Sequence, residues 1–193
     1  QRVNARLSLA AVRALGEQGW SVPEEVLHEG LRGVHLPGRL EVVAGRPLTV
    51  VDGAHNPAAA AALAAALDQG GFPGRPRVFL LGVSADKDLA GIVSPLAPLA
   101  DGAVVARACH HRAAAPEALA ALWQARGVRV EVARGVAAAL LRAREWAGPA
   151  GLVCACGSFF VVAEVREALG LAVREPWPEP RQALAPLLPS LLP

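Results

Sequence analysis

The run Asp52-Gly53-Ala54-His55-Asn56-Pro57 carries several side chains that could do chemistry, and it follows the apolar segment 49–51. Ligands of open parallel sheets bind at the carboxyl ends of strands, where an acid such as Asp52 can accept hydrogen bonds from a ribose or hold a cation. His55 can bind an anion when protonated or act as a neutral donor. The same residues also suit an ordinary capped helix start. Taken alone, they leave a ligand site and a structural cap as equal alternatives.

Other polar groups also follow predicted strands. Ser158 opens a helix, where its hydroxyl and the free backbone N–H groups suit a carboxylate, although a plain N-cap is an equal alternative. Lys87 is the only lysine, and it either approaches an anionic group or is solvated beside a capping Asp. We interpret His110-His111-Arg112 as a rim loop from which Arg112 could touch a substrate. No third ligand lies near the two histidines, so a metal site is not expected there.

The elements that must position these groups alternate between strand and helix. Strands are predicted at 39–43, 47–51, 78–83, 103–106, 128–132 and 152–156. Helices are predicted at 2–17, from about 24 to 32, and at 57–69, 89–99, 116–126, 136–146 and 159–169. This rhythm predicts an α/β fold with a mostly parallel sheet of about six strands, covered on both faces and edged by an N-terminal β-hairpin.

Composition excludes several classes of protein. The 193 residues are 53% apolar and 19% charged, which argues against a disordered chain. The net charge is only +2 and no basic run stands out, so neither nucleic acid nor an anionic membrane is an expected partner. No apolar stretch reaches the length of a membrane helix. Cys154 and Cys156 alternate in an apolar run and are interpreted as buried small hydrophobes, which fits a reducing cytoplasm.

Five motifs in order resemble those of the folylpolyglutamate synthase and dihydrofolate synthase family of the Mur ligase superfamily. They are the Asp52–Pro57 run, Gln1-Arg2-Val3-Asn4-Ala5, Pro37-Gly38-Arg39-Leu40-Glu41, Leu81-Gly82-Val83-Ser84-Ala85-Asp86-Lys87-Asp88 and Gly157-Ser158-Phe159-Phe160. Together they cover the chain up to about residue 170. The resemblance implies a Rossmann-like three-layer sandwich that forms the C-terminal, glutamate-ligase domain of such an enzyme.

The resemblance also implies a domain organisation. Residues 1–36 would be the last helices of the central ATPase domain with a linker, and residues 37–193 the ligase domain, with an irregular Pro- and Leu-rich tail at 172–193. The chain contains no methionine and no phosphate-loop motif. We therefore expect a piece of a longer polypeptide, whose absent N-terminal ATPase domain holds the phosphate loop and the Mg²⁺ ligands.

Roles for single residues follow from the resemblance as well. Asn4, Arg39 and Asp52 would contact the ATP nucleotide, since Arg offers a planar donor fork and Asp suits sugar hydroxyls. His55 and Ser158 would help to hold the incoming glutamate, and Lys87 would approach a phosphate or the glutamate. Without the resemblance, a solvated Arg39 and a surface Asn4 would be the preferred interpretations.

The implied enzyme uses ATP and Mg²⁺ to phosphorylate a dihydropteroate or folate carboxylate, and the amine of L-glutamate then attacks the acyl phosphate. The chain alone is expected to be inactive. Two alternatives stay open at this point. One is a different Mur-type amino-acid ligase, against which the His-Asn-Pro turn argues. The other is a non-catalytic nucleotide-binding module.

Overall fold

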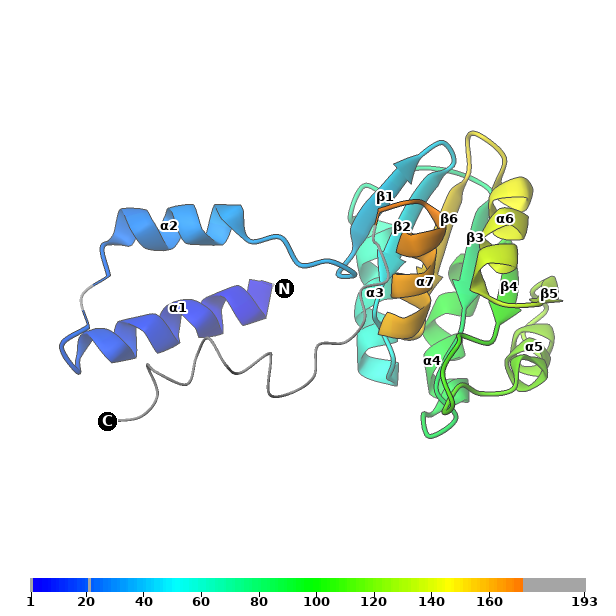
Figure 1. Cartoon of the computed structure of the whole chain (residues 1–193), viewed down its shortest axis with the longest axis horizontal. Coiled ribbons are helices and arrows are strands. Elements are labelled where there is room, and N and C mark those ends of the chain that lie inside the picture. The colour runs from blue at the N-terminus through cyan, green and yellow to red at the C-terminus, as the bar shows by residue number, and fades with distance from the viewer. Residues whose placement is uncertain (1, 21, 172–193) are drawn as a thin grey trace. The chain divides into compact units, whose positions relative to one another are not determined.

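The computed structural model describes residues 2–20 and 22–171, and the chain divides into two compact units at Pro37 and Gly38 (Figure 1). The first unit holds helices α1 (Arg2–Gly16) and α2 (Glu24–Gly33). An ion pair of 2.9 Å between Arg13 and Glu24 links the two helices. The tail predicted at 172–193 lies outside the described residues.

The apolar stripe predicted along the first helix is exposed. Val3 is 67% exposed, Leu7 63% and Leu15 45%. Such a stripe at helical spacing usually packs against a core. Within the described residues it has no such cover, so the first unit presents an apolar surface.

The second unit is built on one six-stranded sheet in the order β1-β2-β6-β3-β4-β5. The strands are β1 (Glu41–Gly45), β2 (Leu48–Asp52), β3 (Arg77–Leu81), β4 (Gly102–Ala106), β5 (Val130–Ala133) and β6 (Leu152–Cys156). β1 pairs antiparallel with β2 as the predicted edge hairpin, and all other pairs are parallel. Strands β3, β4 and β6 are buried along their whole length, as expected for a sheet covered on both sides.

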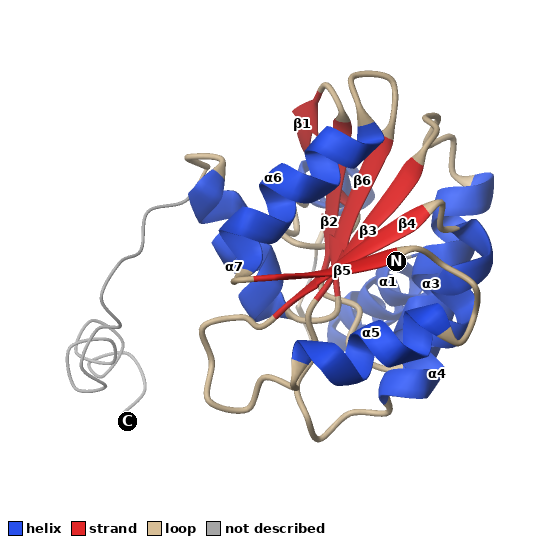
Figure 2. Cartoon of the chain, turned by 90° about the vertical axis from the view of Figure 1, so that its right-hand side faces the viewer, coloured by secondary structure: helices blue, strands red, loops and turns tan. Residues whose placement is uncertain are grey.

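Helices cover both faces of this sheet (Figure 2). One face packs against α3 (Pro57–Gln69), α4 (Leu89–Leu96) and α5 (Pro116–Gln124), through a core that includes Leu63, Ile92 and Trp123. The other face packs against α6 (Val136–Ala147) and α7 (Phe159–Ala168), through Leu140 and Val165. These three layers confirm the predicted α/β sandwich. No helix in the described ranges is long and apolar enough to cross a membrane.

The register brings three strand ends to the same level. Asp52 at the end of β2 pairs with Cys156 at the end of β6, and Cys156 in turn pairs with Leu81 at the end of β3. β6 leads into α7 on one face, whereas its neighbours β2 and β3 lead into α3 and α4 on the opposite face. Strands whose connections leave to opposite faces open a crevice at their carboxyl ends. The sheet therefore has such a crevice above β2, β6 and β3.

Element boundaries differ from the predicted ones by a few residues. The first strand begins at Glu41 instead of residue 39, because the chain turns and bends over residues 37–40, where Leu40 has φ of 47°. The helix predicted at 89–99 is α-helical only to Leu96 and continues as a 3₁₀ turn, Ala97–Leu99. Pro98 has no N–H to continue the α-helical ladder, which accounts for this change.

The cysteines of β6 confirm the interpretation as buried small hydrophobes. Cys154 and Cys156 are both fully buried and free. The pKa of the Cys156 thiol is raised well above its ordinary value, first by the hydrogen bond with Cys154 and then by burial. The thiol is therefore neutral, as a residue of an apolar core should be.

Candidate functional site

A cavity of about 220 Å³ lies above the crevice, and its lining includes three of the predicted site residues together with Arg112 of the predicted rim loop. His55 comes from the turn after β2, Lys87 from the turn after β3 and Ser158 from the turn after β6. The remaining lining residues are Ser84, Asp86, Arg112, Phe159 and Phe160. The sheet register therefore brings together side chains that are up to a hundred residues apart in the chain.

Ser158 is the N-cap of α7. Its Oγ accepts a hydrogen bond from the N–H of Val161 at 3.2 Å, and the residue is only 7% exposed. Gly157 before it has φ of 105°, a conformation that favours glycine. The N–H groups of a first helical turn have no intrahelical partner and attract anions. The start of α7 is thus a cap at the wall of the cavity, with first-turn N–H groups of the kind that attract anions.

The His55 ring is fixed by its own turn. Its Nδ1 lies 2.9 Å from the carbonyl oxygen of Gly53. A carbonyl oxygen can only accept, so Nδ1 carries the hydrogen and donates it. In the neutral ring, Nε2 then has a free lone pair, and in the charged ring it is a second donor. His55 can therefore meet either a donor or an anion with this nitrogen.

The ammonium group of Lys87 forms an ion pair with the neighbouring Asp86. Its Nζ lies 2.9 Å from a carboxylate oxygen of Asp86, and its side chain is 35% exposed. The Lys87 hydrogen bond holds the pKa of Asp86 below its ordinary value. Asp88 caps α4, since its Oδ1 accepts from the N–H of Gly91 at 2.9 Å. The capping Asp predicted beside Lys87 is therefore Asp88, whereas the approach of Lys87 to an anionic ligand stays a prediction.

Asp52 joins two turns. Its Oδ2 accepts from the N–H of Leu40, and its Oδ1 accepts from the N–H of Ala54, both at 2.8 Å. Each carboxylate oxygen can accept a further hydrogen bond, so these contacts leave capacity for a ligand. Asp52 is half-buried, and Asn56, not Asp52, caps α3 through its contact with the N–H of Ala59.

Arg39 lies over the aromatic ring of Phe159, with its guanidinium carbon 4.7 Å from the ring centroid. The same ring fills the space above Gly53, where an added Cβ would lie 2.6 Å from it. Phe159 therefore connects the turn before the hairpin with the turn after β2. The stack uses one face of the guanidinium and leaves its edge donors available.

Asn4 lies in α1 of the first unit and is exposed. It belongs to a separate compact unit, so its predicted meeting with Arg39 and Asp52 stays a prediction.

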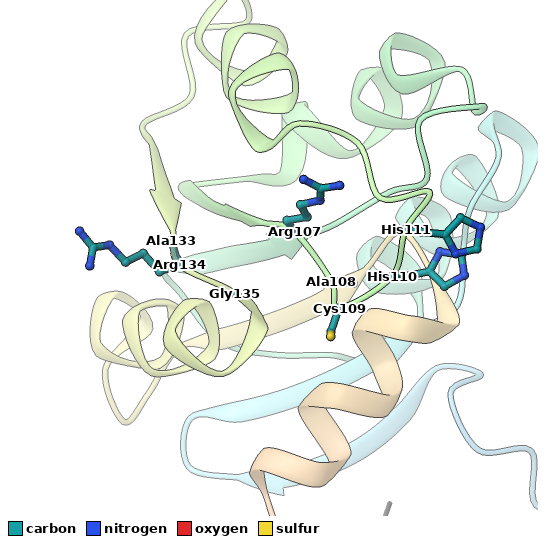
Figure 3. A pocket seen from close by; sticks show the side chains of 8 residues that line it. All are labelled: Arg107, Ala108, Cys109, His110, His111, Ala133, Arg134 and Gly135. Carbon is teal, nitrogen blue, oxygen red and sulfur yellow. The ribbon is translucent and has the colours of Figure 1, made fainter. Parts of the chain in front are cut away.

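A larger cleft of about 580 Å³ lies at the carboxyl ends of β4 and β5 (Figure 3). Its lining is Arg107, Ala108, Cys109, His110, His111, Ala133, Arg134 and Gly135. The side chain of Arg134 points away from the two imidazoles, which lie at the opposite side of the cleft (Figure 3). None of the predicted site residues lines it. The smaller cavity is therefore the better candidate site, because three strand ends converge on it.

Sequence reasoning missed the aromatic wall between these two hollows. Phe160 stacks on His110 with ring centroids 3.8 Å apart. The pKa of His110 is lowered, first by desolvation and then by the charges of His111 and Arg112. No sequence spacing signals this contact, because it joins the loop after β4 to the start of α7.

In the described parts of the chain, no group of three or more His, Cys, Asp or Glu side chains could hold a metal.

Comparisons with known proteins agree with this architecture. The family model described as "Mur ligase, glutamate ligase domain" matches residues 38–159. A protein of Haloferax volcanii named "Probable bifunctional folylpolyglutamate synthase/dihydropteroate synthase" is 37% identical over 174 residues, which is 90% of this chain and 20% of that protein. The dihydrofolate synthase/folylpolyglutamate synthase of Escherichia coli is 33% identical over 86% of this chain and 37% of its own length.

Solved structures agree as well. The folylpolyglutamate synthase of Mycobacterium tuberculosis, in complexes with ADP and AMPPCP, has a TM-score of 0.78 at 33% identity, over 89% of this chain and 39% of that one. The chain thus spans only a fifth to two fifths of the length of these relatives. It belongs to the family of Mur ligase glutamate ligase domains, in the form that folylpolyglutamate and dihydrofolate synthases carry.

Proposed function

We propose that this chain is the glutamate-binding part of an ATP-dependent ligase that joins L-glutamate to dihydropteroate or folate. The observation that carries this proposal is the meeting of His55, Lys87 and Ser158 around one cavity above three adjacent strand ends. A similar solved structure, a bifunctional folylpolyglutamate synthase/dihydrofolate synthase, has L-glutamate and AMPPNP bound; its TM-score is 0.73 at 32% identity, over 83% of this chain and 38% of that one.

In the proposed reaction the terminal phosphoryl group of ATP moves to a carboxylate of the acceptor, which gives an acyl phosphate and ADP. The amine of L-glutamate then attacks the acyl carbon, the C–O bond to phosphate breaks, and the nitrogen loses a proton. His55 and Ser158 hold the glutamate, and Lys87 neutralises a carboxylate or the departing phosphate. Holding the amine beside the acyl carbon replaces a bimolecular encounter with a positioned one.

Arg39 and Asp52, together with Asn4, are proposed to contact the nucleotide. The edge donors of Arg39 and the spare lone pairs of Asp52 suit phosphate or ribose oxygens. Mg²⁺ would neutralise charge on the phosphates. The described residues do not form a cluster that fits a metal, so the proposal assigns the Mg²⁺ ligands to an ATPase domain outside this chain.

The exposed apolar stripe of α1 supports a second part of the proposal. Residues 1–36 would be the end of that ATPase domain, and Val3 and Leu7 would be covered there. Closure of the two domains would exclude water from the acyl phosphate.

The first test uses the chain by itself. With ATP, Mg²⁺, dihydropteroate and L-glutamate, it should release no ADP above a blank, because the acyl phosphate cannot form without a phosphate loop. The full-length enzyme is the positive control and should form ADP only when both the pterin and glutamate are present. Clear turnover by the 193-residue chain alone would refute the proposed division of the site.

The acceptor class is tested in the full-length enzyme. Dihydropteroate or folate should support glutamate-dependent ADP formation, and a UDP-muramoyl acceptor should not. The reverse result would make the chain part of a different Mur-type ligase.

A further inference from the structure

The cavity contains one more cation, Arg112, to which the proposed reaction gives no role. Its backbone is fixed by the turn after β3. The N–H of Ala85 donates to the carbonyl of Arg112 at 2.8 Å, and Ser84 and Ala113 form an antiparallel bridge. The N–H of Ala114 also donates to the carbonyl of Val83 at 2.8 Å. The loop that carries Arg112 is therefore attached to the loop that carries Lys87.

The guanidinium of Arg112 is exposed, and its charge helps to lower the pKa of Asp86 after the larger effect of Lys87. Among the described residues it makes no hydrogen bond and no ion pair, whereas the Lys87 ammonium is paired with Asp86. Arg has five donors in a planar fork that matches a carboxylate in a bidentate manner. Arg112 is therefore better suited than Lys87 to a ligand carboxylate.

The charged and polar groups that line the cavity can compensate the charges of two carboxylates. Asp86 is the only acid among the lining residues, and Lys87 already offsets it. Two separate groups then attract anions, the first turn of α7 with Ser158 and the guanidinium of Arg112. Phe159 and Phe160 form an apolar wall of the same cavity. This arrangement suits a short carbon chain with a carboxylate at each end.

We propose that Arg112 binds the side-chain carboxylate of L-glutamate while the start of α7 binds its α-carboxylate, so that Arg112 selects a dicarboxylic amino acid. The inference rests on the proposed function and adds a residue that decides specificity. L-glutamine has an amide in place of the side-chain carboxylate and so loses the charge-assisted contact with Arg112. A site that leaves such a donor unpaired rejects the uncharged analogue.

The test is steady-state kinetics of the full-length ligase with Arg112→Gln and Arg112→Lys. A charge-assisted hydrogen bond contributes about 1.5–3 kcal/mol, which corresponds to roughly a 10- to 150-fold rise in KM for L-glutamate with Arg112→Gln. The kcat at saturating glutamate should change less than about threefold. Arg112→Lys should recover part of the loss, and the preference for L-glutamate over L-glutamine should fall in proportion.

Arg134→Gln is the matched control, because it removes the same charge from the neighbouring cleft. It should leave the KM for L-glutamate unchanged, and thermal melts should show that each variant folds. An unchanged KM for L-glutamate with Arg112→Gln in an active enzyme would overturn this inference and leave the proposed function in place. So would an equal loss of activity toward both amino acids. A wild-type enzyme that forms no amide with glutamate would instead remove the proposed function, and the inference with it.

Discussion

The carboxylate of Asp52 holds together the two turns that frame the proposed nucleotide side of the site. It accepts from the N–H of Leu40, twelve residues earlier, and from the N–H of Ala54 in its own turn. Leu40 has a positive φ, which is strained for a residue with a branched side chain, and the hydrogen bond from its N–H offsets that strain. Asp52 therefore has a structural task besides the proposed contact with the nucleotide.

We expect Asp52→Ala to reduce ligation by the full-length enzyme severely, and also to lower the free energy of unfolding by about 2 kcal/mol. The loss is smaller than the total stability of a typical domain, so the variant should still fold. Urea unfolding followed by circular dichroism measures the stability, and ADP release measures the activity. Asp68→Ala, on the exposed end of α3, is the control and should change neither. Normal turnover by Asp52→Ala would show that the nucleotide assignment is wrong.

At the residue scale, the sequence did not distinguish a helix cap from a ligand site at Ser158. Ser158 is indeed an N-cap, and it also lines the cavity, so the two interpretations are compatible. Arg39 is exposed, as a solvated charge would be, but its stack on Phe159 restricts it. That stack depends on a residue 120 positions away, which explains why no local sequence pattern predicted it.

At the element scale, the start of α7 is the most constrained part of the site. Gly157 has φ of 105°, and a Cβ there would lie 2.5 Å from the carbonyl oxygen of Gly82. Gly82 in turn donates its N–H to the carbonyl of Cys156 at 3.3 Å. The turns after β3 and β6 therefore approach each other backbone to backbone, and this sets the distance between Ser158 and the Lys87 turn.

We expect Gly157→Ala to lower the free energy of unfolding by at least about 3 kcal/mol, because the backbone oxygen of Gly82 cannot move aside cheaply. Gly127→Ala is the matched control, since Gly127 also has a positive φ but open space around it. It should cost only about 1 kcal/mol, the conformational penalty by itself. Equal costs in urea unfolding would mean that the close approach does not constrain the turn.

Elements whose ends carry proline or strong periodicity were predicted closely. Pro57 and Pro116 stand at the first positions of α3 and α5, where their missing N–H groups cost nothing. Strand ends were predicted less closely, because hydrogen bonding with neighbouring strands sets them. β5, for example, runs from Val130 to Ala133 instead of 128–132, in register with Ala103–Ala106 of β4.

At the scale of the whole molecule, the two compact units differ in how fully they bury their apolar side chains. The second unit has a continuous core on both faces of its sheet. In the first unit no residue of α2 is buried, and the apolar side chains of α1 are largely exposed. A helix pair with so little burial owes little of its stability to packing within the unit.

Limited proteolysis tests this difference. Brief digestion with subtilisin should cut first within residues 34–37, where Val34 is 57% exposed and Leu36 50%, and leave a resistant product that begins near Gly38. N-terminal sequencing and mass spectrometry identify the cut. The loop at 107–114 is the internal control, since its backbone is hydrogen-bonded to the turn after β3 and should resist. Earlier cleavage in that loop would contradict the assignment of the stable unit.

The sequence by itself determined the order and type of the elements and the family, because periodicity, prolines and five short motifs are local features. It also indicated His55, Lys87 and Ser158, since each lies in a turn after a predicted strand and within a motif that resembles the family. Only the tertiary structure decided that these three residues share one cavity with Arg112, and that Phe159 and Phe160 form the apolar wall of that cavity. Strand order and register bring distant residues together, and no local pattern encodes them.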